Sequence, residues 1–148
     1  MITMRFQKYL SNRLNRSAAF CLMALTFGLV LYGCGENKVS QCNKIVTVAN
    51  KAKSLAVPKD NSGFVQLSEN IDQIRVEVQA IAIQDSKLKE QQIQLLGMYA
   101  DISQSLKAQV KAIEAKDKSA VDKAKQDLGA AASKESDIVD RLNALCTK

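Results

Sequence analysis

The residues with the most distinctive chemistry in this sequence are its four cysteines, Cys21, Cys34, Cys42 and Cys146. A cysteine thiol can pair in a disulfide, accept a covalent group or take part in redox exchange. No two of the four have the Cys-x-x-Cys spacing of a redox-active dithiol. The surroundings of each cysteine therefore decide which chemistry we predict for it.

Other groups that could support catalysis are scarce. The chain contains no histidine, which is the commonest general base and the commonest metal ligand. No serine lies in a Gly-x-Ser-x-Gly pattern, and there is no glycine-rich phosphate loop. Carboxylate pairs such as Asp137 and Asp140 have the spacing of an ordinary exposed helix surface. We therefore predict no catalytic residue, no metal site and no cofactor, and a protein that is not an enzyme.

The first 33 residues have the order of a secretory signal, a cationic leader followed by an apolar run. Residues 17–35 carry no charge, and the apolar run extends over residues 18–31. It ends in Leu31-Tyr32-Gly33-Cys34, which resembles the lipobox of bacterial lipoproteins: an aliphatic residue, a tolerant position, a small residue and a cysteine. An uncleaved transmembrane helix is the alternative interpretation of this segment.

The lipobox resemblance implies that the chain is cut between Gly33 and Cys34. A diacylglycerol would be attached to the Cys34 thiol, and an acyl chain such as palmitate to the new amino group. Two or three chains give stable anchoring, whereas one alone is marginal. We accordingly expect a signal peptide over 1–33, a lipidated tether over 34–38 and a domain over 39–148. The domain would be exported and face the periplasm or a lumen, and Gly35 in place of an aspartate favours the outer membrane.

If this resemblance holds, Cys21 leaves with the signal and Cys34 carries lipid, so Cys42 and Cys146 remain. An exported compartment is oxidising enough for them to form a disulfide. In the chain-entropy model, closing a loop of about 100 residues stabilises a fold by roughly 4.7 kcal/mol. We predict a structural disulfide between Cys42 and Cys146, with two free thiols as the alternative.

The elements that must position these cysteines are predicted to be helices. Pro58 is the only proline and lies in a loop over residues 57–63. Apolar residues recur at spacings of three and four in four segments, namely 42–56, 64–81, 88–113 and 121–145. No strand-like alternation interrupts them, so the fold class is all-α.

Two arrangements of these helices remain open. In the first, an up-down four-helix bundle places the start of helix one and the end of helix four at the same end, where the disulfide closes it. In the second, residues 64–115 form one long helix and two shorter helices fold back on it. The second is possible because the apolar residues of segments 64–81 and 88–113 share one heptad frame. Asp85 and Gln92 occupy two positions of that frame that are otherwise apolar. We favour a break, because Asp85-Ser86 is a plausible helix start.

Charge argues against a nucleic-acid partner. The leader takes four of the 21 Lys and Arg residues, so 17 remain beside all 15 Asp and Glu residues. The densest lysines, between Lys107 and Lys125, alternate with acids. After the signal only Phe64 and Tyr99 are aromatic, which leaves no stacking surface for single-stranded nucleic acid.

Four features of these helical segments allow more than one interpretation. Asp85 and Glu135 could be buried acids lining a cleft, or a turn residue and a residue at the bundle margin. The small-residue run 129–132 could let helix four approach a neighbour or leave a groove. Gly97 costs about 1 kcal/mol relative to alanine in a helix, with no evident compensation.

We expect a non-enzymatic helical interaction module that is anchored to a membrane through Cys34 and binds a protein partner in the envelope. Residues 38–43 (KVSQCN) and the leader resemble small cyanobacterial lipoproteins. That resemblance implies, as a sharper variant, a lumenal photosystem subunit comparable to the lipidated extrinsic Q subunit of photosystem II. The alternative from another class is a carrier or sensor that holds an apolar small molecule between the helices.

Overall fold

The computed structural model describes residues 36–147, which form one helical unit. The predicted signal peptide and Cys34 lie outside these residues. Within them the chain forms five helices and no strand: α1 (Lys38–Lys53), α2 (Asn61–Gln79), α3 (Ser86–Glu114), α4 (Lys118–Ala132) and α5 (Lys134–Cys146). The predicted all-α class is confirmed.

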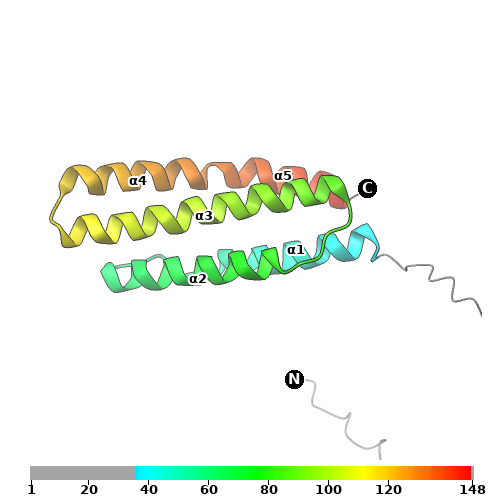
Figure 1. Ribbon diagram of the computed structural model, residues 1–148, viewed down its shortest axis with the longest axis horizontal. Coiled ribbons are helices and arrows are strands. Elements are labelled where there is room, and N and C mark those ends of the chain that lie inside the picture. Colours follow the sequence, from blue (N-terminus) through cyan, green and yellow to red (C-terminus); the bar gives the residue numbers. More distant parts are fainter. Residues whose placement is uncertain (1–35, 148) are drawn as a thin grey trace, which may run out of the picture. The chain divides into compact units, whose positions relative to one another are not determined.

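The helices run up and down along one axis (Figure 1). The 29-residue α3, about 43 Å long, is the central element. It packs along α2 on one side and along α4 and α5 on the other, while α1 packs against α2 and contacts α5. The bundle arrangement predicted from the sequence is thus confirmed, with α4 and α5 forming its fourth arm.

The described helices α1 to α4 begin at polar residues that cap them. Each capping side chain accepts a hydrogen bond from the backbone N–H three residues further on, which satisfies a group that the helix itself leaves unpaired. The caps are Asn37, Asp60, Asp85 and Asp117, with N···O distances of 2.7 to 3.0 Å. These side chains determine where each of the four helices starts.

The boundary between α2 and α3 rests on the two polar residues that interrupt the shared heptad frame. Asp85 caps α3 through the Leu88 N–H at 2.9 Å. Gln92, which is fully buried, donates from Nε2 to the carbonyls of Val78 at 2.6 Å and Ile81 at 2.9 Å. These carbonyls belong to the last turn of α2 and the turn after it. The alternative of one helix over 64–115 is therefore wrong.

Another buried polar side chain, that of Gln41, holds the α2–α3 turn against α1. Gln41 accepts a hydrogen bond through Oε1 from the Gln84 N–H at 2.7 Å. Its Nε2 donates to the Glu36 carbonyl at 2.6 Å. A single side chain of α1 therefore ties the α2–α3 turn to the start of the described chain.

The apolar core is one cluster contributed by α1, α2, α3 and α5. Its buried members are Cys42, Ile45, Ile71, Ile74, Val78, Leu88, Leu95, Met98, Tyr99, Ile138 and Leu142. Leu106, Val110 and Ala124 are also buried and lie toward the α3–α4 turn. These residues match the apolar stripes, so the helix faces predicted from their spacing are the faces that pack.

The fourth predicted helix is divided at Ser133. The Ser133 hydroxyl donates to the Ala130 carbonyl at 2.9 Å, and its backbone keeps helical angles (φ −63°, ψ −19°). Hydroxyl bonds of this kind often bend a helix, while the chain continues in nearly the same direction. α4 and α5 consequently follow one another along the same side of α3 (Figure 1).

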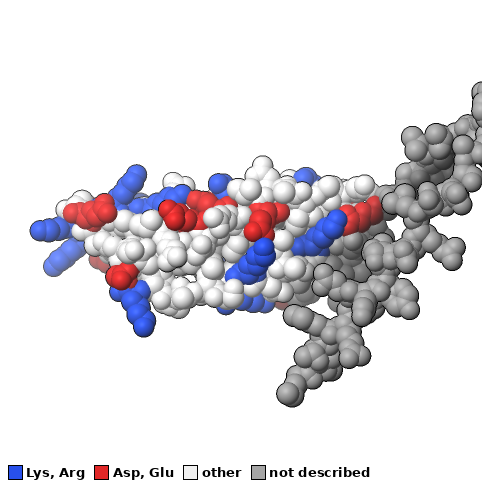
Figure 2. Space-filling model, turned by 90° about the horizontal axis from the view of Figure 1, so that it is seen from below, with Lys and Arg blue, Asp and Glu red and all other residues white. Residues whose placement is uncertain are grey.

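Charged side chains of both signs cover the surface. On the face seen in Figure 2, Lys and Arg side chains are interspersed with Asp and Glu along the bundle. Surface ion pairs connect neighbouring helices: Lys51 with Glu77, Lys107 with Asp72, and Lys134 with Asp101. Exposed pairs of this kind each contribute about 0 to 1 kcal/mol, so the core and the disulfide dominate stability.

Candidate functional site

Cys42 and Cys146 form the predicted disulfide. Their Cα atoms are 5.7 Å apart and their sulfur atoms are bonded, and the two positions have a sequence separation of 104. The bond joins the second turn of α1 to the last turn of α5. It therefore closes the bundle at the end where the described chain begins.

The predicted lipidation residue Cys34 and the cleavage residue Gly33 lie outside the described residues, which begin at Glu36. The Glu36 carboxylate forms an ion pair with Lys44 at 2.7 Å and accepts a hydrogen bond from the Ser40 hydroxyl. These hydrogen bonds, the one from Lys44 foremost, lower the pKa of Glu36. Glu36, the first described residue, is therefore held against α1.

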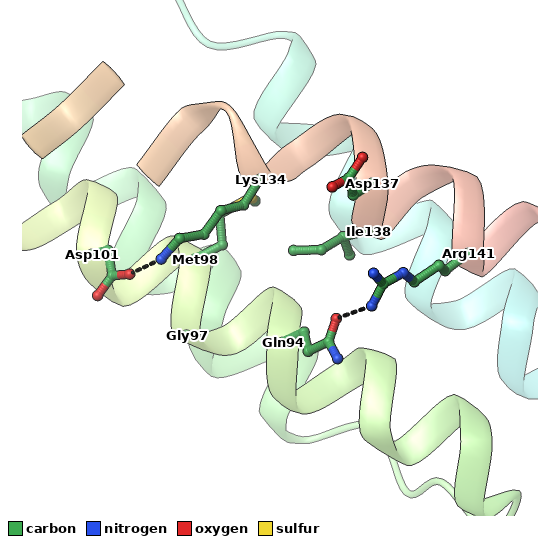
Figure 3. Close-up of a pocket in the computed structure, with 8 residues that line it drawn as sticks. All are labelled: Gln94, Gly97, Met98, Asp101, Lys134, Asp137, Ile138 and Arg141. Atoms are coloured by element: carbon green, nitrogen blue, oxygen red, sulfur yellow. Dashed lines mark hydrogen bonds and ion pairs between the residues drawn. The ribbon is translucent and has the colours of Figure 1, made fainter. Parts of the chain in front are cut away.

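A groove lies between α3 and α5 (Figure 3). It has a volume of about 350 Å³ and is open to solvent. Four residues from each helix line it: Gln94, Gly97, Met98 and Asp101 from α3, and Lys134, Asp137, Ile138 and Arg141 from α5. Met98 and Ile138 form its apolar floor. This volume lies in the range of small-ligand sites.

The rim of this groove carries charges of both signs. Lys134 Nζ lies 2.8 Å from Asp101, and Arg141 Nη1 donates to the Gln94 side-chain oxygen at 3.4 Å. In Figure 3 these two contacts bridge α3 and α5 on either side of Ile138. The groove thus offers a hydrogen-bonding and charged border around an apolar strip.

Gly97 gains a role from this geometry. It is exposed on α3 and lines the groove, and a Cβ placed there would meet nothing within 4 Å. Packing therefore does not require glycine at this position. Its missing side chain widens the groove, which is the compensation that the sequence alone did not reveal.

A second, smaller hollow lies between α1, α3 and α5. Its volume is about 220 Å³. The walls come from Val46, Ala49, Leu95, Tyr99, Val139 and Leu142, and the polar lining from Asn50, Lys53, Glu135 and Asn143. Tyr99 is 4% exposed, and its hydroxyl reaches only one protein acceptor among the described residues, the Ala49 carbonyl at 3.5 Å. We call this hollow the α1–α5 cavity.

Burial raises the pKa of Tyr99 to about 12, and the negative charge of Glu135 adds to the effect. Removing water from around a phenol disfavours its ionised form, and a nearby carboxylate does the same. The Tyr99 hydroxyl therefore stays protonated at physiological pH and is available there as a hydrogen-bond donor.

Asp85 and Glu135, the two acids whose roles the sequence left undecided, lie in different environments. Asp85 caps α3, which agrees with the interpretation as a turn residue. Glu135 is exposed and lines the α1–α5 cavity, so it is an acid beside a hollow but is not buried. Within residues 36–147 no cluster of three or more histidine, cysteine or acidic residues could hold a metal ion.

The small-residue run 129–132 lines neither of these two hollows. Ala131 is buried, whereas Gly129 is exposed and a Cβ there would meet nothing within 4 Å. Both hollows instead flank α5, beyond the interruption at Ser133. Sequence reasoning missed them because no periodic pattern shows where two packed helices diverge. The one available signal was a lone tyrosine in an apolar stripe.

Comparisons of the chain with protein-family models, with curated proteins and with solved structures found no match. None of the helices described between residues 36 and 147 combines the length and the apolar character needed to cross a bilayer.

Proposed function

We propose that this chain is a bacterial lipoprotein whose helical bundle, attached to a membrane through acyl chains on Cys34, binds another protein of the envelope. The lipobox-like residues 31–34 and the preceding leader support the anchor. Export would place the domain in an oxidising compartment, in keeping with a cysteine pair that closes the bundle. Gly35 favours attachment to the outer membrane.

The contacts of Glu36 are the observation that carries this proposal furthest. They fix the chain to α1 only two residues after Cys34. Two extended residues span at most about 7 Å, so acyl chains on Cys34 would hold this end of the bundle against the bilayer. The opposite end, at the α3–α4 turn, would lie about 40 Å further out along α3. The sides of the bundle would then be free to meet a partner.

The α3–α5 groove is the best candidate for the surface that meets this partner. Protein interfaces combine an apolar centre with a polar, hydrogen-bonding rim. Met98 and Ile138 supply the centre, and Lys134, Asp101 and Arg141 supply the rim. The nearby Gly97 leaves room for an inserted side chain of the partner.

The anchor is tested by the intact mass of protein extracted from membranes, measured before and after reduction. We expect the mass of residues 34–148 plus two or three acyl chains, increasing by about 2 Da when the disulfide is reduced. An unmodified full-length mass would refute lipidation and support an uncleaved membrane helix instead.

The partner is tested by site-specific photocrosslinking in intact cells. A photoreactive amino acid replaces Asp137 in the groove, and, as a matched control, Asp122 on the exposed surface of α4. We expect a crosslinked band of discrete mass from position 137 only, which Gly97→Arg in the same chain abolishes. Equal crosslinking from both positions, or none from position 137, would contradict the role of the groove.

A further inference from the structure

The α1–α5 cavity is separate from the groove proposed for a protein partner, because it opens on the other side of α5. α1 and α5 are joined at one end by the Cys42–Cys146 bond and otherwise make few contacts. Ala49 contributes only a methyl group to the wall. Its small side chain keeps α1 and α5 from filling the space between them.

The walls and the lining of the cavity differ in chemistry. Leu95, Leu142 and the ring of Tyr99 are buried apolar surface. Lys53 on α1 and Glu135 on α5 are exposed, and no ion pair joins them among the described residues. One charge of each sign gives the opening no preference for an anion or a cation.

The Tyr99 hydroxyl is the polar group that the fold leaves incompletely satisfied in this cavity. Buried tyrosine hydroxyls normally find a good hydrogen-bond partner. Here the one acceptor found for it in residues 36–147 lies at 3.5 Å, the far limit of a hydrogen bond, although Tyr99 is only 4% exposed. A bound molecule with an acceptor atom would give this hydroxyl a closer partner.

We propose that the α1–α5 cavity binds a small, neutral, mostly apolar molecule that carries one hydrogen-bond acceptor, and that the Tyr99 hydroxyl donates to this acceptor. An apolar cavity of about 150 Å³ suffices for benzene, so about 220 Å³ holds a single six-membered ring with a carbonyl group. A full-length acyl chain exceeds that volume. The proposal is independent of the membrane anchor and of the protein partner.

The experiment uses residues 36–147 with the disulfide formed, because the whole core and both bonded cysteines lie within them. Far-UV circular dichroism verifies that this domain is helical. Tyr99 is the only tyrosine in this part of the chain, so NMR of protein with labelled tyrosine rings reports on the cavity alone. The probe is cyclohexanone, and cyclohexane serves as a ring of similar size without an acceptor.

We expect a saturable shift of the Tyr99 ring signals with cyclohexanone, and a weaker effect with cyclohexane at equal free concentration. Ala49→Leu, which fills the cavity, should abolish the response to both. Tyr99→Phe, followed through the amide signals of Ala49 and Val139, should weaken cyclohexanone binding about fivefold to tenfold and leave cyclohexane unchanged. Gly97→Ala, on the opposite side of α5, is the matched control and should bind as the wild type does.

Two results would overturn the proposal. The first is the absence of a saturable shift in the wild-type domain, a test that requires no variant. The second is unchanged cyclohexanone binding in a helical, oxidised Ala49→Leu domain. Equal affinity for the two rings would contradict the role of the Tyr99 hydroxyl.

Discussion

Gln92 donates a hydrogen bond from its side-chain amide to the backbone carbonyl of Val78, at 2.6 Å and with both groups buried. The bond joins the first turns of α3 to the last turn of α2. Gln92 occupies a position at which the heptad pattern of the neighbouring sequence predicts an apolar residue. The side chain that interrupts the pattern is thus the one that stabilises the turn.

Replacing Gln92 with leucine tests this relationship. Leucine restores the apolar heptad but removes the side-chain donor of the Ile81 carbonyl and one donor of the Val78 carbonyl, which keeps its bond from the Ile81 N–H at 3.2 Å. A buried polar group left unpaired costs about 1 to 3 kcal/mol, so Gln92→Leu should lower the free energy of unfolding by that amount in urea titrations. Gln104→Leu, at an exposed position of α3, is the control and should change it by less than about 0.5 kcal/mol. Higher stability of Gln92→Leu would mean that the continuous helix is accessible.

The disulfide should be a major contribution to stability. Cys42 and Cys146 enclose a loop of about 100 residues, for which the chain-entropy model gives roughly 4.7 kcal/mol. We expect the double variant Cys42→Ser and Cys146→Ser to unfold at a clearly lower urea concentration than the oxidised protein. Adding a reductant should lower the urea midpoint of the wild type to a similar value and leave the midpoint of the double variant unchanged. A wild type insensitive to reductant would contradict the prediction.

Gly97→Ala should stabilise the domain by about 1 kcal/mol, because glycine is that much less favourable than alanine inside a helix. A methyl group at this position has no neighbour within 4 Å to clash with. Thermal unfolding followed by circular dichroism measures the effect as a rise in Tm. A lower Tm for Gly97→Ala would contradict this prediction and would mean that a methyl group is not tolerated at this exposed position.

Lys116 lies in the turn between α3 and α4 and has a φ of 57°, in the left-handed region. Backbone bonds from Lys116 to Ile113 and from Asp117 to Ala112 give this turn the pattern of a Schellman cap, in which glycine is the usual residue. Lys116→Gly should therefore stabilise the fold by roughly 0.5 to 1 kcal/mol. The neighbouring substitution Ala115→Gly, at a residue with right-handed angles, should destabilise it instead.

Alkaline pH should destabilise the domain in part through Tyr99. Its pKa is raised to about 12 in the fold, from 10.0 for a free tyrosine, so the unfolded chain loses the proton first. The associated stability is fully present below pH 10 and is lost as the pH rises toward 12. Tyrosinate absorbance at 295 nm reports this single residue in 36–147. Tyr99→Phe should lose less stability than the wild type over the same interval, whereas an absorbance midpoint near 10 would contradict the burial.

The sequence was sufficient to predict the helices and their packing faces, because apolar spacing of three and four residues depends only on helix geometry. It also pointed to the break at Asp85, since an aspartate before a serine is a recognisable helix start. It did not reveal the interruption at Ser133. A serine gives no reliable signal for such a break, because Ser68 makes the same kind of hydroxyl bond to the Val65 carbonyl inside the uninterrupted α2.

The same limit applies to the candidate sites. Cys42 and Cys146 could be paired from the sequence, because the lipobox resemblance assigns Cys21 and Cys34 other fates and the predicted bundle places the two remaining cysteines at one end. The hollows on either side of α5 could not be predicted. They depend on how closely α1, α3 and α5 pack, and the residues that line them, such as Ala49 and Gly97, are ordinary residues for a helical sequence pattern.

The Cys42–Cys146 bond also determines how mechanical tension would travel through the molecule. A pull on the chain at Glu36 enters α1 and reaches the bond within six residues, before most of α1 is loaded. From there the covalent path continues directly into the last turn of α5. A partner that holds α5 would thus be connected to the N-terminal end of the domain through covalent bonds, and the tension would bypass α2, α3 and α4.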